Sequence, residues 1–258
     1  MSQLDKIWDA TTYDNKLSFV SELGKNILEL LNVQKGEKVL DLGCGTGDLA
    51  HSIHDHGAIV SGIDFSEAMI QQARQKYPAL SFDVADAQTY RTSEQYDAVF
   101  SNAALHWMKQ PEKAIETTWL ALRAGGRFVA EFGGKGNIQS VYQAIVHYFA
   151  RRGMDAAARN PWFFPTIGEY GHLLEQQGFR ITYARHFDRP ILLAGGEQSI
   201  IHWLNIFAAP FFTDWSDQDK SQAMEEIAAD LETSLYKDGQ WIVDYSRIQI
   251  IAYKPLTE

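Results

Sequence analysis

The residues of this sequence that could do chemistry centre on one short stretch, KVLDLGCGTGD, at residues 38–48. After a run of aliphatic residues, every second position is a glycine: Gly43, Gly45 and Gly47. Glycine adopts positive φ freely and carries no Cβ, so a ligand can lie directly against the backbone of such a turn. The stretch therefore predicts a buried strand that ends in a nucleoside-binding turn.

The spacing of the turn bears on which nucleoside it binds. Dinucleotide-binding turns read G-x-G-x-x-G, and their last glycine lets a helix pack closely beside a pyrophosphate. Here that position is Asp48, whose carboxylate would repel a phosphate at the helix start. NAD and FAD are disfavoured, and S-adenosylmethionine (SAM) is favoured. Thr46 or Asp48 is expected to cap the helix that follows.

The string DLGCGTG, with Asp41 in the acidic position, resembles motif I of the class I SAM-dependent methyltransferases, D/E-x-G-x-G-x-G. The resemblance extends over most of the chain. It implies an α/β fold with a Rossmann-like, seven-stranded, mostly parallel sheet whose last strand is antiparallel. Within this class SNAALHW, EFGGKGN and DGQWIVDYSRIQIIAYK look most similar to bacterial trans-aconitate-methyltransferase-like proteins, which implies a carboxylate oxygen as the methyl acceptor.

A second expected strand, residues 58–64, ends in an acid about twenty residues after the first glycine. A carboxylate at that distance in a βαβ unit binds the ribose hydroxyls, so Asp64 is expected to hold the nucleoside. Phe65 and Met69 are expected to pack near adenine, although core packing alone would explain both. Ser66 is expected to cap the next helix.

Further candidates follow the third and fourth expected strands, residues 80–84 and 96–101. Asp86, with Ala87 beside it, matches by position the acid that binds the adenine amino group in the resembled family; an Asp that merely starts a loop is also common. Asn102 closes the fourth strand and is expected at the cofactor. The Asn-Pro-Pro-aromatic motif of adenine and glutamine methyltransferases is missing at this place, which disfavours those acceptors.

His106 and Trp107 are expected at the ligand-bearing end of the sheet. His106, with an ordinary pKa near 6.5, could hold or deprotonate an acceptor, or it could bond a loop carbonyl. Trp107 would face the sulfonium or the substrate. Glu131, near the end of the fifth expected strand (127–132), either faces the ligand crevice or accepts amide hydrogens from the glycine loop after it.

Two segments are expected to cover the ligand-bearing end. In the N-terminal segment, Tyr13 is the candidate that covers the methionine part of the cofactor and Trp8 is a candidate for the acceptor pocket; both could instead anchor a helix to the core. An aromatic-rich insertion that includes Trp203 precedes the last strand. It is interpreted as a lid over an apolar acceptor pocket, while a helical brace or a dimer surface would explain the same pattern.

The whole chain of 258 residues is expected to form a single domain. Its expected parts are an N-terminal cap (1–33), the SAM-binding core (34–134), helices and strand six (135–192), the lid (193–240) and the last strand (241–258).

The net charge of −10 argues against a general affinity for nucleic acid or anionic membrane, because phosphate contacts depend on clusters of Lys and Arg. No stretch approaches the eighteen or so apolar residues of a membrane span, and the N-terminus has no apolar signal region. A cytoplasmic enzyme, monomeric or weakly dimeric, that methylates a small molecule is expected. A nicotinamide-dependent oxidoreductase and a SAM-binding protein without catalysis are the alternatives.

Neither a disulfide nor a metal site is expected. Cys44 is the only cysteine, and its place in the glycine turn suits a small side chain better than a nucleophile. His51, His54 and His56 form a cluster, but no cysteine or clear inward acid completes a tetrahedral set.

Overall fold

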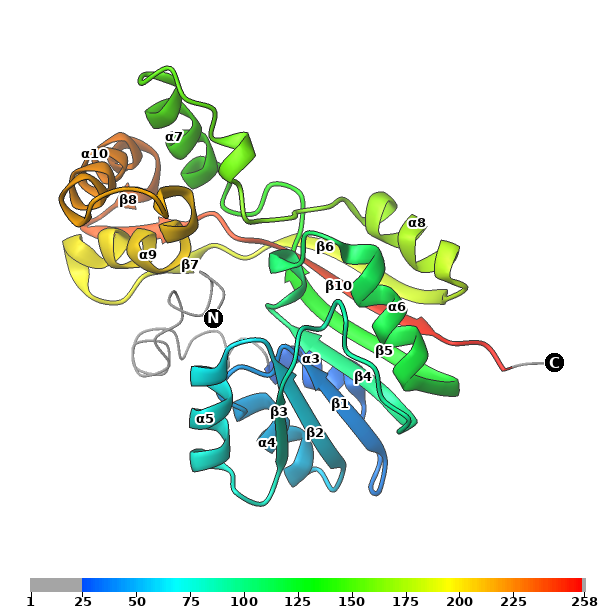
Figure 1. Ribbon diagram of the computed structural model, residues 1–258. Helices are drawn as coiled ribbons and strands as arrows, with labels where there is room; N and C mark the ends of the chain where they lie inside the picture. The colour runs from blue at the N-terminus through cyan, green and yellow to red at the C-terminus, as the bar shows by residue number, and fades with distance from the viewer. Residues whose placement is uncertain (1–24, 257–258) are drawn as a thin grey trace.

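A seven-stranded sheet forms the centre of the computed structural model, which describes residues 25–256 (Figure 1). The strand order is β3-β2-β1-β4-β5-β10-β6. The strands are β1 (Lys38–Leu42), β2 (Ile59–Asp64), β3 (Ser81–Val84), β4 (Tyr96–Asn102), β5 (Leu122–Gly133), β6 (Arg180–Asp188) and β10 (Ser246–Tyr253). The pairs among β1 to β5 are parallel, and β10 is antiparallel to both of its neighbours. The expected α/β sheet with an antiparallel last strand is confirmed.

Helices cover both faces of this sheet (Figure 1). Side chains alternate between the faces along a strand, so Val39 of β1 packs on one side and Leu40 and Leu42 on the other. Val39 shares its core with α3 (Lys25–Leu31), α4 (Asp48–Asp55) and α5 (Glu67–Lys76). The opposite core includes α6 (Pro111–Ala121) and α8 (Ile167–Gln177).

The starts of two helices test the expected caps. Ser66 caps α5 as predicted, because its hydroxyl accepts the amide hydrogen of Met69 at 3.4 Å. The expected cap of α4 is wrong: Gly47, at φ 85°, precedes the helix, and no side chain of residues 25–256 caps it. The Asp48 carboxylate instead accepts a hydrogen bond from the Tyr77 hydroxyl at 2.6 Å and forms an ion pair with Lys76 at 2.5 Å. Both contacts direct the Asp48 side chain towards the end of α5.

A second unit with its own hydrophobic core stands beyond one end of the sheet (Figure 1). We call residues 138–162 and 191–245 the accessory unit. It contains α7 (Gln139–Ala150), α9 (Ser199–Phe207), α10 (Asp217–Leu235) and the small sheet of β7 (Ile191–Leu192), β9 (Gln240–Val243) and β8 (Tyr236–Lys237). Helix α7 packs against α10, so the unit extends beyond the insertion at residues 193–240. Short 3-10 turns complete the chain: η2 (Leu105–Trp107), η3 (Ala157–Arg159), η4 (Gly196–Gln198) and η5 (Ala209–Phe212).

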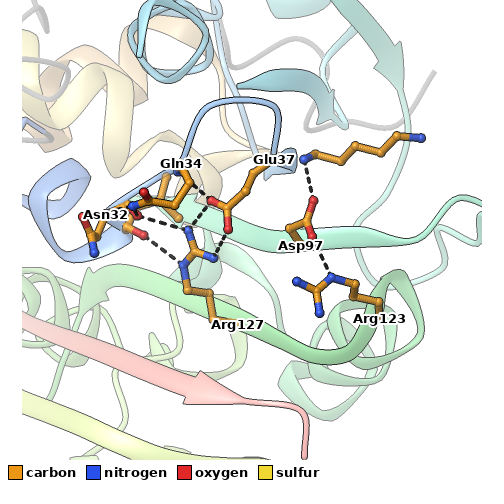
Figure 2. A network of polar contacts seen from close by, with 8 residues as sticks. Asn32, Gln34, Glu37, Asp97, Arg123 and Arg127 are labelled. Atoms are coloured by element: carbon orange, nitrogen blue, oxygen red, sulfur yellow. Dashed lines mark hydrogen bonds and ion pairs between the residues drawn. The ribbon is translucent and has the colours of Figure 1, made fainter. Parts of the chain in front are cut away.

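Paired charges tie the sheet together at the opposite end, where β1 and β4 begin (Figure 2). The Arg127 guanidinium donates to both carboxylate oxygens of Glu37, at 2.8 and 2.7 Å, and this contact lowers the pKa of Glu37. Asp97 accepts from Arg123 at 2.6 Å and from the Lys38 amide at 2.8 Å. Burial alone would raise the pKa of Asp97, but these hydrogen bonds outweigh it and lower the pKa. We call these two pairs the basal network.

Candidate active site

The glycine turn has one closely packed face and one open face. Gly43, Gly45 and Gly47 all have positive φ, at 80°, 55° and 85°. A Cβ on Gly43 would lie 2.3 Å from the Cβ of Ala104, in the loop after β4, whereas a Cβ on Gly45 would meet nothing within 4 Å. The turn is therefore pressed against the β4 loop and leaves its backbone accessible at Gly45. Cys44 is buried, which raises the pKa of its thiol, as suits a packing side chain better than a nucleophile.

Two carboxylates lie beside this turn, Asp64 half-buried and Asp41 buried. Asp64 accepts amide hydrogens from Gly45 at 3.0 Å and from Ser66 at 2.9 Å. Asp41 is 2% exposed, and its Oδ2 has no hydrogen-bond partner among residues 25–256. Burial, with the neighbouring charge of Asp64, raises the pKa of Asp41 to about 8. A buried acceptor of this kind suits a ligand that brings a cation or a hydrogen-bond donor.

The other residues expected at the cofactor lie along the same edge of the sheet. Because β1 to β4 are parallel, their carboxyl ends meet there, and Asp86 and Asn102 follow or close two of these strands. Asp86 is exposed and accepts the amide hydrogen of Gln88 at 2.8 Å. Three apolar candidates belong to the same region: Phe65 is half-buried, and Met69 and Ala87 are core residues. Tyr13 and Trp8 lie outside the described residues.

A cleft lies between the sheet and the accessory unit, with an empty volume of about 460 Å³ that includes its open mouth. It starts beside the glycine turn, since Ala103 lines it and Ala104 faces Gly43. The other lining residues are His106, Trp107, Asn137, Ile138, Trp162, Phe164, Trp203, Phe207, Tyr245 and Arg247. Of the residues expected at the acceptor, the structure therefore brings together His106, Trp107 and Trp203.

His106 is a neutral hydrogen-bond donor in this cleft. It is 8% exposed, and its Nδ1 accepts the amide hydrogen of Gly133 at 3.3 Å. Burial, reinforced by the charge of Arg247, lowers its pKa well below 6.5. In a neutral imidazole that accepts through Nδ1, the proton must be on Nε2. This geometry favours a ring that donates to an acceptor through Nε2, while Nδ1 binds an amide rather than a loop carbonyl. The expected role as a base stays a prediction.

Glu131 has neither of the two roles expected from the sequence. It does not line the cleft, and its carboxylate binds no amide of the glycine-rich loop after β5. Its carboxylate is 3% exposed and forms a two-pronged pair with Arg189, at 2.5 and 3.0 Å, while the Gln249 side chain donates to it at 2.7 Å. Arg189 follows β6 on the way to the accessory unit, so Glu131 fastens that connection to the sheet.

Sequence reasoning missed three polar residues of the cleft, Asn137, Tyr245 and Arg247. The predicted antiparallel last strand contained the signal for Arg247. Such a strand begins at the edge where its parallel neighbours end, and Arg247 indeed pairs with Gly133 at the end of β5. It is 6% exposed, with its guanidinium carbon 4.8 Å from the ring centroid of Tyr245. Tyr245 in turn accepts the indole hydrogen of Trp203 at 2.6 Å.

Comparisons with known proteins decide the family. Residues 39–126 match the model of a family described as a methyltransferase domain. An uncharacterised methyltransferase from Schizosaccharomyces pombe is 35% identical over 263 aligned residues, covering 96% of this chain and 98% of that protein. The chain belongs to the SAM-dependent methyltransferases.

Two further comparisons extend this result. The methyltransferase is 24% identical to trans-aconitate 2-methyltransferase from Escherichia coli O1:K1, over 95% of this chain and 97% of that protein. The fold matches phosphoethanolamine N-methyltransferase 2 of Haemonchus contortus in complex with SAM, with a TM-score of 0.54 and 17% identity, over 90% of this chain and 52% of that one.

The cofactor of this methyltransferase is SAM, and the turn fits it chemically. SAM carries an ammonium, a sulfonium and a ribose diol, all of them cations or donors, and the site offers a buried carboxylate oxygen on Asp41 and open backbone at Gly45. Within residues 25–256, three or more His, Cys, Asp or Glu side chains nowhere group as metal ligands. The helices of that part of the chain are all too short or too polar to cross a membrane.

Proposed function

We propose that this methyltransferase transfers the methyl group of SAM to a carboxylate oxygen of a small molecule bound in the cleft. One observation supports the proposal: among the described lining residues, the ionisable side chains are placed as hydrogen-bond donors or are weak bases. His106 offers a donor hydrogen, burial raises the pKa of Tyr245 to about 12, and Arg247 stays protonated. A carboxylate is already ionised near neutral pH, whereas a hydroxyl or an ammonium group must first lose a proton.

On the cofactor side, three carboxylates at the ligand-bearing edge take the polar ends of SAM. We assign the SAM ammonium to Asp41, the ribose hydroxyls to Asp64 and the adenine amino group to Asp86, with Asn102 beside the cofactor. The adenine would lie among the apolar side chains of Phe65, Met69 and Ala87. SAM itself supplies an activated methyl group on its sulfonium, so the protein mainly has to place the acceptor.

On the acceptor side, His106 would donate its Nε2 hydrogen to one carboxylate oxygen and leave the other free for the methyl group. Trp107 and Trp203 would exclude water from the reacting groups. Holding the oxygen in line with the sulfonium then supplies most of the acceleration. The similarity to trans-aconitate 2-methyltransferase supports an acid as the acceptor.

A substrate panel tests the proposal. The purified protein is incubated with methyl-labelled SAM and matched sets of carboxylic acids, phenols and amines. We expect label in acids only, as base-labile methyl esters. At saturating SAM, kcat/KM for the acid should stay flat between pH 6 and pH 9, because the acceptor is ionised and His106 does not titrate there.

Three results would contradict the proposal. The first is a methylated phenol or amine as the main product. The second is a pH inflection near 6.5 that disappears in His106→Asn, since that would identify the ring as a base. The third is a complete lack of transfer to every acid while SAM binding remains intact, which would favour a binding protein without catalysis.

A further inference from the structure

We propose that Phe164 is a positioning residue for His106. Its ring holds the imidazole against the amide of Gly133, so that Nε2 is the nitrogen offered to the acceptor. The inference rests on the proposed function, in which the Nε2 hydrogen of His106 binds the acceptor carboxylate. It adds a residue that acts on the reaction through His106.

A segment that runs from the accessory unit to α8, residues 160–165, passes beside His106. We call it the aromatic segment. The Phe163 amide donates to the His106 carbonyl at 2.8 Å, and the Pro165 carbonyl accepts the amide hydrogen of Lys135 at 2.8 Å. The residue between these two hydrogen bonds is therefore held beside both the loop after β4 and the loop after β5.

The ring of Phe164 packs against both partners of the hydrogen bond that orients His106. The centroids of the phenyl and imidazole rings are 5.7 Å apart, at an interplanar angle of 34°. A Cβ on Gly133 would lie 2.7 Å from Cε1 of Phe164, so the phenyl ring occupies the space that a side chain there would need. The ring therefore adjoins the imidazole and also the residue whose amide binds Nδ1.

The hydrogen bond by itself holds the imidazole weakly. The Gly133 nitrogen and Nδ1 of His106 are 3.3 Å apart, which is long for an N–H donor, and the last torsion of a histidine side chain is soft. A half-turn about that torsion would place a carbon opposite the amide and move Nε2 from its position. The packed phenyl ring of Phe164 opposes this rotation.

The origin of Phe164 in another segment distinguishes it from the other ring beside His106. Trp107 lies equally close, at 5.7 Å, but it is the next residue of the same 3-10 turn and moves with the histidine. Phe164 is itself packed against Trp162, whose ring stacks on it at 5.8 Å and 22°. Trp162 is 3% exposed in the core of the accessory unit. The position of His106 therefore depends on the packing of that unit.

The surroundings of His106 make its titration a report of this packing. Among the described lining residues, the other groups that titrate or carry charge are Tyr245 and Arg247. Burial raises the pKa of Tyr245 to about 12 and arginine stays protonated, so neither changes charge between pH 5 and pH 8. Burial is the main cause that lowers the pKa of His106, and the charge of Arg247 adds to it. Without the Phe164 ring, water reaches the imidazole and its pKa should rise towards 6.5.

Nitrogen-15 NMR of the histidine side chains tests the inference without any acceptor. The signal that is lost in His106→Ala identifies the residue, and all spectra are recorded with S-adenosylhomocysteine bound. In the wild type we expect a ring protonated on Nε2 that does not titrate between pH 5.5 and pH 8. In Phe164→Ala we expect a mixture of tautomers and a pKa within about one unit of 6.5. Phe164→Leu refills the space with apolar atoms and should restore most of the wild-type behaviour.

Phe163→Ala is the matched control. Phe163 is the neighbouring residue of the aromatic segment and is also half-buried, but its side chain packs against the core that includes α6 and α8 and does not line the cleft. Its backbone bond to His106 remains in the variant. The tautomer and the titration of His106 should therefore be unchanged. Melting temperature checks that each variant is folded.

Kinetics with the acid that the substrate panel identifies give a second test. Phe164→Ala should lower kcat by about tenfold or more while KM for SAM stays within about twofold, because the donor to the acceptor is misplaced. Its kcat/KM for the acid should fall below about pH 6.5, since a protonated ring has no lone pair on Nδ1 for the Gly133 amide. The wild-type profile should stay flat. In a His106→Ala background, Phe164→Ala should cause little further loss, because the two residues act as one unit.

The inference is overturned by a wild-type His106 that is protonated on Nδ1 or titrates near 6.5, or by an unchanged tautomer and pKa in Phe164→Ala. An equal loss of activity from Phe164→Ala with and without His106 would also overturn it, because the phenyl ring would then act on the acceptor directly. If the NMR results agree but every acid is inert, the proposed function fails and the positioning of the imidazole stands.

Discussion

The two ends of the central sheet use charged residues in opposite ways. At the base, Glu37 and Asp97 each face an arginine, and the pKa of both carboxyl groups is lowered (Figure 2). At the ligand-bearing end, the buried Asp41 lies near the half-buried Asp64, and the pKa of both carboxyl groups is raised. The charge pairs at the base stabilise the fold, whereas the other end keeps carboxyl groups whose ionised form a cationic ligand would stabilise.

The opposite pKa shifts make the free energy of unfolding depend on pH in opposite directions. A lowered pKa, as at Glu37, contributes stability that is present above the unfolded pKa and is lost as the pH falls. Asp41 has the reverse shift, from 3.8 to about 8. The folded protein then holds a proton that the unfolded chain has released, so the free energy of unfolding decreases as the pH rises through that window. Occupation by SAM should offset this loss.

The largest expected effect comes from breaking the basal network. Arg127→Ala removes both hydrogen bonds to Glu37 and leaves that carboxylate largely buried, since the two side chains are 12% and 17% exposed. Leaving one partner of such a pair uncompensated costs about 3 kcal/mol. Urea denaturation should show this loss in the free energy of unfolding. The affinity for SAM, measured on the folded protein, should stay the same.

The matched control is Lys38→Ala. Lys38 pairs with Glu94 at 2.9 Å, but both side chains are nearly half exposed, so the loss should stay below about 1 kcal/mol. If Arg127→Ala weakened SAM binding as strongly as it weakened the fold, the separation of roles between the two ends would be wrong.

The second effect concerns the ligand-bearing end. Asp64→Asn keeps the shape of the side chain and an acceptor for one backbone amide, but it removes the charge offered to the ribose hydroxyls. Losing a charged hydrogen bond should cost about 2 kcal/mol, or about 30-fold in the SAM dissociation constant. Calorimetric titration measures it. The free energy of unfolding should change little, because the variant also removes a half-buried charge, whose desolvation raises the pKa of Asp64.

Asp83→Asn serves as the control for Asp64. Asp83 is an exposed acid on the adjacent strand β3, paired with Arg74 at 3.5 Å. Its loss should leave SAM affinity unchanged. If the wild-type and Asp64→Asn proteins bound SAM with equal affinity, the Asp64 carboxylate would bind only the amides of Gly45 and Ser66 and not the ribose.

The sequence was sufficient for the parts of this molecule that depend on local pattern. Alternating apolar residues placed the strands, and the strand observed at residues 246–253 lies within the segment expected for the last strand, 241–258. Motif spacing brought Asp41, Asp64 and the glycine turn to one edge. These features follow from chain direction and periodicity, which neighbouring residues determine.

Features that depend on tertiary partners were not predictable in this way. The donor role of His106 requires the amide of Gly133, which lies 27 positions away, and the pairing of Glu131 requires Arg189. The accessory unit joins two separate stretches of chain in one core, and no local pattern shows that α7 belongs to it. The position of Arg247 could have been predicted, because an antiparallel last strand must begin at the ligand-bearing edge.

The smallest expected effect is a dependence of SAM binding on pH. Asp41 must lose its proton to receive the SAM ammonium, and burial together with Asp64 raises its pKa to about 8. Between pH 7 and pH 8, SAM affinity should therefore rise by about threefold, which is less than about 1 kcal/mol. Above pH 8 it should fall, because an α-amino group loses its own proton near there. Titration in two buffers of different ionisation enthalpy should detect a released proton at pH 7.

A ligand without the amino-acid part separates this effect from the other carboxylate. 5′-Methylthioadenosine keeps the adenine and ribose, so it can engage Asp64 but brings no ammonium to Asp41, and its affinity should stay flat over the same range. Asp41→Asn should make SAM behave in the same way. If SAM affinity were constant from pH 6 to pH 8 and no proton were released, the buried oxygen of Asp41 would not be the group that receives the ammonium. The contrast between the two ends of the sheet would then concern stability alone.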